Sequence, residues 1–451
     1  MAAAAAAWVW PERWPDRCHD PPRDHDFATA DSSAGSWPQY SAHLAALKGR
    51  RQLAQFRCSA AAADRHTDRS SVWTCRVPLL TEILSLPAAS PGLTRHLTVL
   101  RFRGSAPGPK AYIQAAVHAD EVPALLVAQQ LRAQLLALDA AGRLRGEILL
   151  LPYANPIGLG QFLHGRHLGR FELDGGENFN RGYPDLFEPV AAALVGRLGQ
   201  EARANVACIR AALRAALPQQ LPASENAALK QRLYSLSCDA DVVLDLHCEF
   251  EAILHSYIGT PLWPEATDLA ACLGSEVNLL AEDSGGNAFD EANSRLWWRL
   301  AARFPEHPIP PACLAATIEL RGERDVDEAL ATSDATGLVR FLAGRGFVDG
   351  MSDLPRPTAT ASPLEAVDTL NATQAGVLTW TLPLGAELRR GEILGHLTDP
   401  ETGRREPLVA RNEGRLFARR GHRWVRPGQW LAKIAGREPL PWRQAGALLG
   451  D

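Results

Sequence analysis

The chain has 451 residues, which is long enough for two or three domains. Its residues are 46% hydrophobic and 22% charged, a composition too apolar for a chain that is disordered throughout. Its formal net charge of -4 predicts no nucleic-acid partner and no acidic-membrane partner. No apolar run approaches the roughly 20 residues that a membrane-spanning helix needs, so we predict no membrane partner of that kind either.

The N-terminal region and the cysteines indicate in which cellular compartment the protein is expected. The eight cysteines are scattered, without a C-x-x-C pair, which is typical of free thiols in a reducing environment. The opening MAAAAAAWVW has no basic region and no sustained hydrophobic core, so it does not resemble a signal peptide. We therefore predict a cytoplasmic protein. Residues 1–76 have no regular period, and we expect a poorly ordered N-terminal extension there.

Regular patterning begins after this extension. Residues 97–103 and the apolar run 113–117 predict strands, and residues 147–153 predict a further buried strand. Between the last two, residues 122–138 carry apolar side chains at helical spacing. Strands that alternate with helices in this way favour a mostly parallel α/β sheet.

A histidine and a glutamate stand where the second of these strands gives way to the helix. His118 and Glu121 lie three residues apart, and Pro123 suits only the first helical turn. The end of a buried strand is the usual place for a ligand site in an open α/β sheet. Both side chains can bind zinc, although an H-x-x-E pair by itself also arises by chance in long chains.

The middle of the chain contains a long polar segment. Residues 155–185 are rich in glycine, arginine and asparagine, and a loop of this length inside a domain is usually functional or disordered. Residues 189–236 are alanine-rich, which favours helix. The later elements that we predict are strands at 241–246, 252–257, 276–281 and 314–320, and helices at 264–273 and 325–344.

A change of texture marks a second domain. Residues 351–362 are a Pro/Thr/Ala linker after a catalytic domain at 77–350. Residues 363–437 form short strands with glycine turns in two similar halves, and resemble a biotinyl/lipoyl-type barrel, with a tail at 438–451. A carrier domain needs a lysine on the hairpin between its halves, but the only lysine here is Lys433, near the end. We expect a lid over a cleft instead.

Three predicted strand ends offer polar groups to one place. His118 and Glu121 follow one strand, His247 follows DVVLDL, and Glu319 lies within TIEL. Two histidines and one glutamate are a common zinc-hydrolase ligand set, and a separate carboxylate can take the proton of a water. Each group could also be a satisfied polar core residue. Asp245 could orient a ligating imidazole or serve as a structural hydrogen-bond partner.

The ordered motifs carry a resemblance to a known family. They resemble the zinc carboxypeptidase superfamily, and are most similar to its succinylglutamate desuccinylase/aspartoacylase branch, over residues 77–437. The motifs are HADE at 118–121, NP at 155–156, GRF at 169–171, NFNR at 178–181, DLH at 245–247 and TIELRG at 317–322. The resemblance implies a mixed, mostly parallel twisted sheet flanked by helices. It also implies one zinc ion per chain bound by His118, Glu121 and His247, with Glu319 as the general base.

The same resemblance implies how a substrate would bind. Asn180 and Arg181 match the pair that binds the substrate carboxylate, and Arg170 matches the arginine that polarises the scissile carbonyl. Arg166 is a rival for that role, because the spacing from Arg170 to Asn180 is longer than in aspartoacylase. Asn178 also stands where aspartoacylase has an acidic residue. TIELRG is closer to the peptidase form of its motif, which leaves the substrate class open.

We therefore expect a zinc-dependent deacylase that hydrolyses the amide of a small N-acyl amino acid or similar carboxylate-bearing substrate. The alternatives are a metallocarboxypeptidase and a catalytically silent binding scaffold. Glu249 could contact a substrate amine or form a salt bridge, and Trp297 and Trp298 are expected in the core or an interface. The sequence indicates no oligomeric state.

Overall fold

The computed structural model describes residues 79–263, 265–351, 355–356 and 360–449, all within one compact unit. The predicted N-terminal extension and part of the predicted linker lie outside the described residues. Among the residues that are described, no helix combines the length and the apolarity needed to cross a bilayer.

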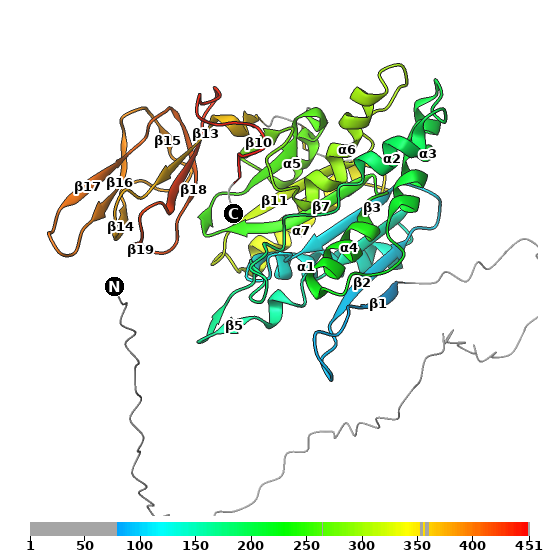
Figure 1. The fold of residues 1–451 in the computed structure, drawn as a ribbon, viewed down its shortest axis with the longest axis horizontal. Coiled ribbons are helices and arrows are strands. Elements are labelled where there is room, and N and C mark those ends of the chain that lie inside the picture. Colours follow the sequence, from blue (N-terminus) through cyan, green and yellow to red (C-terminus); the bar gives the residue numbers. More distant parts are fainter. Residues whose placement is uncertain (1–78, 264, 352–354, 357–359, 450–451) are drawn as a thin grey trace, which may run out of the picture. The chain divides into compact units, whose positions relative to one another are not determined.

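A nine-stranded mixed sheet forms the centre of the α/β part (Figure 1). The pairs β1–β2, β2–β4 and β9–β11 are antiparallel, and the other neighbouring strands run parallel. The mixed, mostly parallel sheet expected from the sequence is confirmed. In spatial order the strands are β1 (Leu80–Ser85), β2 (His96–Arg103), β4 (Glu147–Leu151), β3 (Lys110–Ala115), β7 (Val242–Glu249), β11 (Leu314–Gly322), β9 (His255–Gly259), β10 (Val277–Ala281) and β12 (Ser362–Pro363).

Helices cover both faces of this sheet, and alternate strand residues face the two layers. On β3, Tyr112 packs into one hydrophobic cluster and its neighbour Ile113 into the other. The Tyr112 layer contains α2 (Phe187–Leu194), α3 (Ala202–Ala216), α4 (Glu225–Ser237) and α6 (Phe289–Arg303). The Ile113 layer contains α1 (Pro123–Ala140), α5 (Thr267–Leu273) and α7 (Glu328–Gly344).

Helix α1 illustrates how the sequence determines an element next to the site. Pro123 occupies its first turn, where the missing N–H has no helical partner to lose. Ala124, Ala128, Leu131 and Leu135 recur three or four residues apart and are buried. The helix therefore packs this stripe on the sheet, with its start fixed at the end of β3.

The C-terminal part is all-β, as predicted, and forms two sheets around a leucine-rich core. One sheet has the order β13–β20–β18–β15 and the other β17–β16–β14–β19. Their bounds are β13 (Val367–Asn371), β14 (Gly376–Trp380), β15 (Glu387–Leu388), β16 (Ile393–Thr398), β17 (Arg405–Val409), β18 (Gly414–Arg419), β19 (Trp424–Val425) and β20 (Trp430–Ala435).

A short strand joins the two parts. β8 (Glu251–Ala252), which lies between β7 and β9 in the chain, pairs antiparallel with β18 of the all-β part. The Glu251 carboxylate accepts hydrogen bonds of 2.6 Å from both Arg419 and Arg423. The all-β part is therefore attached directly beside the end of β7.

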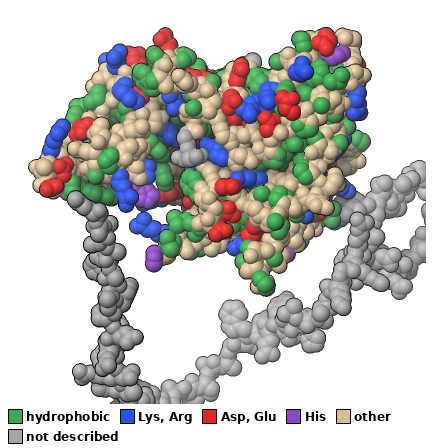
Figure 2. Space-filling view, viewed as in Figure 1, with side chains coloured by type: hydrophobic (Ala, Val, Ile, Leu, Met, Phe, Trp, Pro, Cys, Tyr) green, Lys and Arg blue, Asp and Glu red, His purple; other side chains and the backbone are tan. Residues whose placement is uncertain are grey.

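Most predicted elements appear near their expected bounds. The elements that the sequence did not reveal include β1, α6 and the short strands β5, β6 and β12. The long segment 155–185 contains a 3-10 turn at Gly158–Gly160 and a hairpin of β5 (Phe162–Leu163) and β6 (Arg166–His167). Trp297 is fully buried in the core, as expected. Basic and acidic side chains are intermixed over the face of the molecule seen in Figure 2.

Candidate metal centre and adjoining pocket

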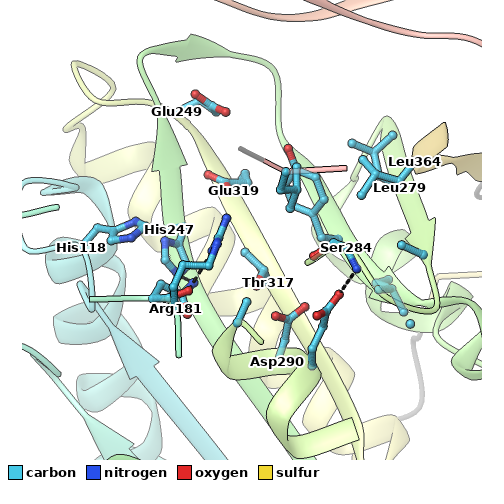
Figure 3. A pocket seen from close by; sticks show the side chains of 18 of the residues that line it. His118, Arg181, His247, Glu249, Leu279, Ser284, Asp290, Thr317, Glu319 and Leu364 are labelled. Carbon is cyan, nitrogen blue, oxygen red and sulfur yellow. Dashed lines mark hydrogen bonds between the residues drawn. The ribbon is translucent and has the colours of Figure 1, made fainter. Parts of the chain in front are cut away.

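The predicted site residues meet at the carboxyl edge of three adjacent parallel strands, β3, β7 and β11 (Figure 3). His118 lies in the turn between β3 and α1, and His247 lies on β7. Glu319 lies on β11 and is the register partner of His247. Residues that are far apart in the chain are brought together because the sheet aligns the ends of these strands.

His118, Glu121 and His247 form a buried group that could hold a metal ion, with one ligand atom of each within 4.8 Å of the others. The Nδ1 atom of His118 lies 2.9 Å from one Glu121 oxygen, and that of His247 lies 2.8 Å from the other. The described residues contain this one group of metal-binding side chains.

The outer nitrogens of both imidazoles have partners of their own. His118 Nε2 lies 2.8 Å from Asn178 Oδ1, which can only accept a hydrogen bond. His247 Nε2 lies 2.9 Å from Asp245 Oδ2, close enough for an ion pair but not aligned for a hydrogen bond. Asn180 Nδ2, which can only donate, also lies 3.3 Å from His247 Nε2. A proton on His118 Nε2 leaves the Nδ1 lone pair of that ring facing the Glu121 carboxylate. Two imidazoles and a carboxylate directed at one another are a donor set that fits a divalent cation.

Charge around the two imidazoles differs. Burial and the cationic Arg170 lower the pKa of His118 to about 4, which keeps it neutral. Burial also acts to lower the pKa of His247, but the carboxylates of Asp245 and Glu121 outweigh it and raise that pKa well above its ordinary value. The acidic surroundings of His247 therefore favour positive charge at the centre of the group.

The backbone turn that presents His118 is tight. Ala116 has a positive φ of 57°, unusual for a residue with a Cβ atom, and turns the chain sharply after β3. Gly169 packs against this turn, and its carbonyl accepts from Ala119 N at 3.0 Å. A Cβ atom at Gly169 would lie 2.2 Å from Asp120 N, so only glycine permits this approach.

This contact places Arg170 beside the metal group. Its Nη1 atom lies 3.2 Å from both His118 Nδ1 and Glu121 Oε1. Its rival from the sequence, Arg166, is exposed on the β5–β6 hairpin. The structure therefore brings Arg170, and not Arg166, to the group.

Asn180 and Arg181 line the same pocket. Asn180 Oδ1 accepts a 2.9 Å hydrogen bond from Phe289 N at the start of α6, which fixes the segment in place. Arg181 donates to the Asn180 carbonyl at 2.8 Å, and its side chain extends over His247 toward Glu319 (Figure 3). Gly286 lies against it, since a Cβ atom there would be 2.5 Å from Arg181 Cδ.

Glu319 is buried close to the metal group without being part of it. One carboxylate oxygen, Oε2, has no hydrogen-bond partner among the described residues. Burial and the negative charge of Glu121 raise the pKa of Glu319 to about 8. Such a carboxylate holds and releases a proton near neutral pH.

Glu249, beyond His247 on β7, pairs with Lys433 on β20. Of the two alternatives left open by the sequence, the structure contains the salt bridge. The lysine ammonium also lies 4.7 Å from the centre of the Trp430 ring. The single lysine of the all-β part thus reaches the edge of the pocket.

Two cavities adjoin the metal group. A cavity of about 90 Å³ lies on the α6 side and is lined by Arg181, Thr317, Asp290 and Glu291, among others. A cavity of about 620 Å³ lies on the side of the all-β part, lined in part by Phe250 and Trp430. Arg170, Glu249 and Lys433 line both, so the metal group lies between two spaces of unequal size.

Sequence reasoning missed the α6 side. Asp290 and Glu291 are buried in the first turn of α6 and face the smaller cavity. Burial and the charge of Glu291 raise the pKa of Asp290 to about 7. Ala288 occupies the N-cap, so the capping side chain that usually marks the start of a helix is missing.

Comparisons with known proteins find a matching family model and similar solved structures. The sequence model of the succinylglutamate desuccinylase/aspartoacylase catalytic domain matches residues 107–345. A succinylglutamate desuccinylase/aspartoacylase family structure from Shewanella amazonensis SB2B is 26% identical, with a TM-score of 0.70 over 79% of this chain and 98% of that one. No curated protein matches the sequence at the significance threshold.

Two further solved structures share the fold. One is a succinylglutamate desuccinylase/aspartoacylase structure from Shewanella frigidimarina NCIMB 400. It is 24% identical, with a TM-score of 0.72 over 80% of this chain and 98% of that one. The product-bound structure of the ectoine utilization protein EutE from Ruegeria pomeroyi is 16% identical, with a TM-score of 0.56 over 81% of this chain and 96% of that one.

Proposed function

The chain belongs to the succinylglutamate desuccinylase/aspartoacylase family, and on this premise we propose that it is a zinc-dependent deacylase. Its substrate is a small N-acyl amino acid or a similar carboxylate-bearing compound, and its reaction is hydrolysis of the amide bond. The observation that carries the proposal is the buried group of His118, Glu121 and His247, beside which the Glu319 Oε2 atom has no hydrogen-bond partner among the described residues.

His118, Glu121 and His247 would hold one zinc ion through two Nδ1 atoms and the carboxylate. When bound, zinc supplies Lewis acidity to a water and to the substrate carbonyl. Asn178, within hydrogen-bond distance of His118, would hold that ring with its Nδ1 atom directed inward, and the charge of Asp245 would act on His247. The Asp245 carboxylate is itself fixed by a 2.9 Å hydrogen bond from Gln114.

Glu319 is the proposed general base. Its unpaired Oε2 atom can accept a proton from a water molecule, and the carboxyl group can then donate that proton to the departing amide nitrogen. Its raised pKa suits both steps, since the protonated and ionised forms are each accessible near neutral pH. A nearby cation would favour the ionised form, which is the one that accepts the proton.

The two arginines divide the remaining tasks. Arg170, beside the metal group, would stabilise the negative charge that develops on the carbonyl oxygen. Arg181, with its planar guanidinium in the smaller cavity, would bind the substrate carboxylate through paired hydrogen bonds. The amino-acid half of the substrate then lies on the α6 side, and the acyl half faces the larger cavity.

A hydrolysis screen tests the proposal. Zinc-loaded protein is incubated with a panel of N-acyl amino acids, and the released amine is measured. We expect turnover of at least one member that the His247→Ala variant does not show. Stoichiometric zinc binding without hydrolysis of any member would contradict deacylase activity and favour the binding-scaffold alternative.

A metallocarboxypeptidase is the second candidate, and the size of the larger cavity favours it. A space of about 620 Å³ can hold more than a small acyl group. Comparing a dipeptide and a tripeptide with the acetylated form of the same C-terminal amino acid separates the two activities. Faster cleavage of the peptides would replace the deacylase proposal with the peptidase.

A further inference from the structure

We propose that the smaller cavity selects substrates whose amino-acid half carries an ammonium or guanidinium group in addition to its carboxylate, and that Asp290 binds this cation. The inference rests on the proposed function for the identity of the substrate as an N-acyl amino acid. It deepens that function by naming a substrate class.

The floor of the cavity is unusually acidic for a buried surface. Asp290 and Glu291 are 8% and 7% exposed, and both line the cavity from the first turn of α6. Glu291 Oε1 accepts a hydrogen bond of 2.5 Å from Ser284 N, while its Oε2 atom is buried without a partner in the described chain. The positive charges of Arg295 and His247 act on Glu291 and Asp290, but neither carboxylate forms an ion pair within the described residues. Burying a carboxylate without an ion pair is costly, so such a pair needs a reason.

Asp290 has no cationic partner among the ion pairs of the described residues. Of the arginines of its own helix, Arg295 pairs with Asp283 and Arg299 with Asp185, and Arg303 lies in the last turn, at the opposite end of the helix from Asp290. Figure 3 shows the Asp290 carboxylate directed from α6 into the pocket, on the side of Thr317. The carboxylate therefore faces the space that a ligand would fill.

A purely structural role does not account for this carboxylate. Acidic residues in the first turn stabilise a helix through its dipole, and Asp290 and Glu291 both occupy that turn. For Asp290 the helix end does not compensate for burial, because burial and Glu291 raise its pKa to about 7. An exposed acid would provide the same helix stabilisation without that cost.

The cavity also contains the opposite charge. Arg181 and Asp290 line the same space of about 90 Å³. That volume has room for about six water molecules or more, enough for an amino acid of moderate size. A ligand with one carboxylate and one cationic group satisfies both side chains at once, whereas a neutral or dicarboxylic amino acid leaves Asp290 uncompensated.

Two chemical sources supply such a cation. An Nα-acylated basic amino acid presents its side-chain ammonium, and an Nω-acylated one presents its free α-ammonium. Matched pairs of substrates separate them. Nα-acetyl-lysine is compared with Nα-acetyl-norleucine, which lacks the side-chain amine, and Nε-acetyl-lysine with 6-acetamidohexanoate, which lacks the α-amine.

With zinc-loaded wild-type protein we expect the cationic member of one pair to have a kcat/KM about tenfold or more above that of its neutral counterpart. Asp290→Asn should bring that ratio close to one. Asp283→Asn is the matched control, since Asp283 is an acid of the same region that pairs with Arg295 outside the cavity lining, and the ratio should stay high. Ratios near one in both wild-type pairs, or a ratio that survives in Asp290→Asn, would overturn the proposal.

Binding of the free amino acids keeps the test independent of hydrolysis. Calorimetry compares lysine with norleucine and with 6-aminohexanoate on zinc-loaded protein. Tighter binding of lysine that Asp290→Asn abolishes supports the proposal even if no N-acyl amino acid is hydrolysed, in which case only the deacylase function fails. Equal binding of all three compounds to wild-type protein would overturn it.

Discussion

The pocket has two walls, and each contains a buried carboxylate. The two carboxylates differ in whether the protein provides a partner for their charge. On the metal side, Glu121 lies between two imidazoles and accepts a 3.0 Å hydrogen bond from Cys248 N. On the α6 side, Asp290 is as deeply buried but forms no ion pair within the described chain. The first charge is compensated by the two imidazoles, whereas the partner that we propose for the second is a ligand. Changes on the metal side should therefore affect all substrates equally, while changes on the α6 side should distinguish between substrates.

The largest expected effect is loss of the metal. His247→Ala removes one of the three proposed ligands. Because the outer partners of a metal ligand are worth about 10–100-fold in affinity, zinc binding should fall by more than about 100-fold. Turnover of every substrate should disappear with it. Zinc content by mass spectrometry and activity test this, with the His396→Ala variant of the all-β part as the control. Full zinc occupancy in His247→Ala would remove His247 from the site.

Removal of the proposed base should be the next largest effect. Glu319→Gln keeps the size of the side chain but cannot accept a proton, so kcat should fall by about 100-fold or more for all substrates. Zinc content should stay the same, because Glu319 is not in the ligand group. Steady-state kinetics together with metal analysis decide the matter. Turnover near that of the wild type would place the base elsewhere.

Arg181 lies where the two walls meet, and its substitution should have an intermediate effect. Arg181→Lys keeps the charge but loses the planar pair of donors, at a cost of about 1.5–3 kcal/mol in substrate binding. The loss should appear mainly in KM, and a substrate with an amidated carboxylate should lose little further on the variant. Arg197→Lys, on an exposed arginine, is the control. If the wild-type protein turns over the amidated substrate as well as the acid, carboxylate recognition is wrong.

The last prediction concerns stability rather than activity. In metal-free protein the pKa of Glu319 is raised to about 8, whereas an unfolded glutamate titrates near pH 4.3. Between these values the folded state keeps a proton that the unfolded state has released. Raising the pH therefore lowers the free energy of unfolding, by up to about 1.4 kcal/mol per pH unit from this one group.

Glu319→Gln should abolish that contribution. Urea unfolding of metal-free protein at pH 5 and pH 7.5 should show the variant gaining stability relative to the wild type as the pH rises. Saturating zinc should shrink the difference, since a neighbouring cation stabilises the ionised form. A constant difference between the two proteins at all pH values would mean that Glu319 has an ordinary pKa.

The metal side could be predicted from the sequence because chelation demands particular residue types at particular places. His118 and Glu121 follow an apolar run, and His247 and Glu319 lie within or at the end of others. Parallel strands align their ends, so these positions had to meet. The choice between Arg170 and Arg166 could not be made, because it depends on Gly169 packing against the His118 turn, a contact between distant segments.

The α6 side could not be predicted, for a different physical reason. The apolar residues Phe289, Leu296, Trp297 and Leu300 have helical spacing, but the first turn lacks a capping side chain and follows glycines. Asp290 is buried, whereas a sequence-based prediction places an aspartate at the surface by default. Strand β1 was missed because most of its residues are exposed, so its sequence lacks a buried face.

The pairing of β8 with β18 has a consequence for the order in which the protein is built. Arg419 is 168 residues from its partner Glu251, and Lys433 is 184 residues from Glu249. A ribosome makes about 5–20 residues per second, so the end of β7 waits roughly ten seconds or more for these partners. During that time Glu249 and Glu251 have no counter-charge from the all-β part. We therefore expect the pocket to be among the last regions to mature on a nascent chain, although its metal-binding residues are all made in the first part of synthesis.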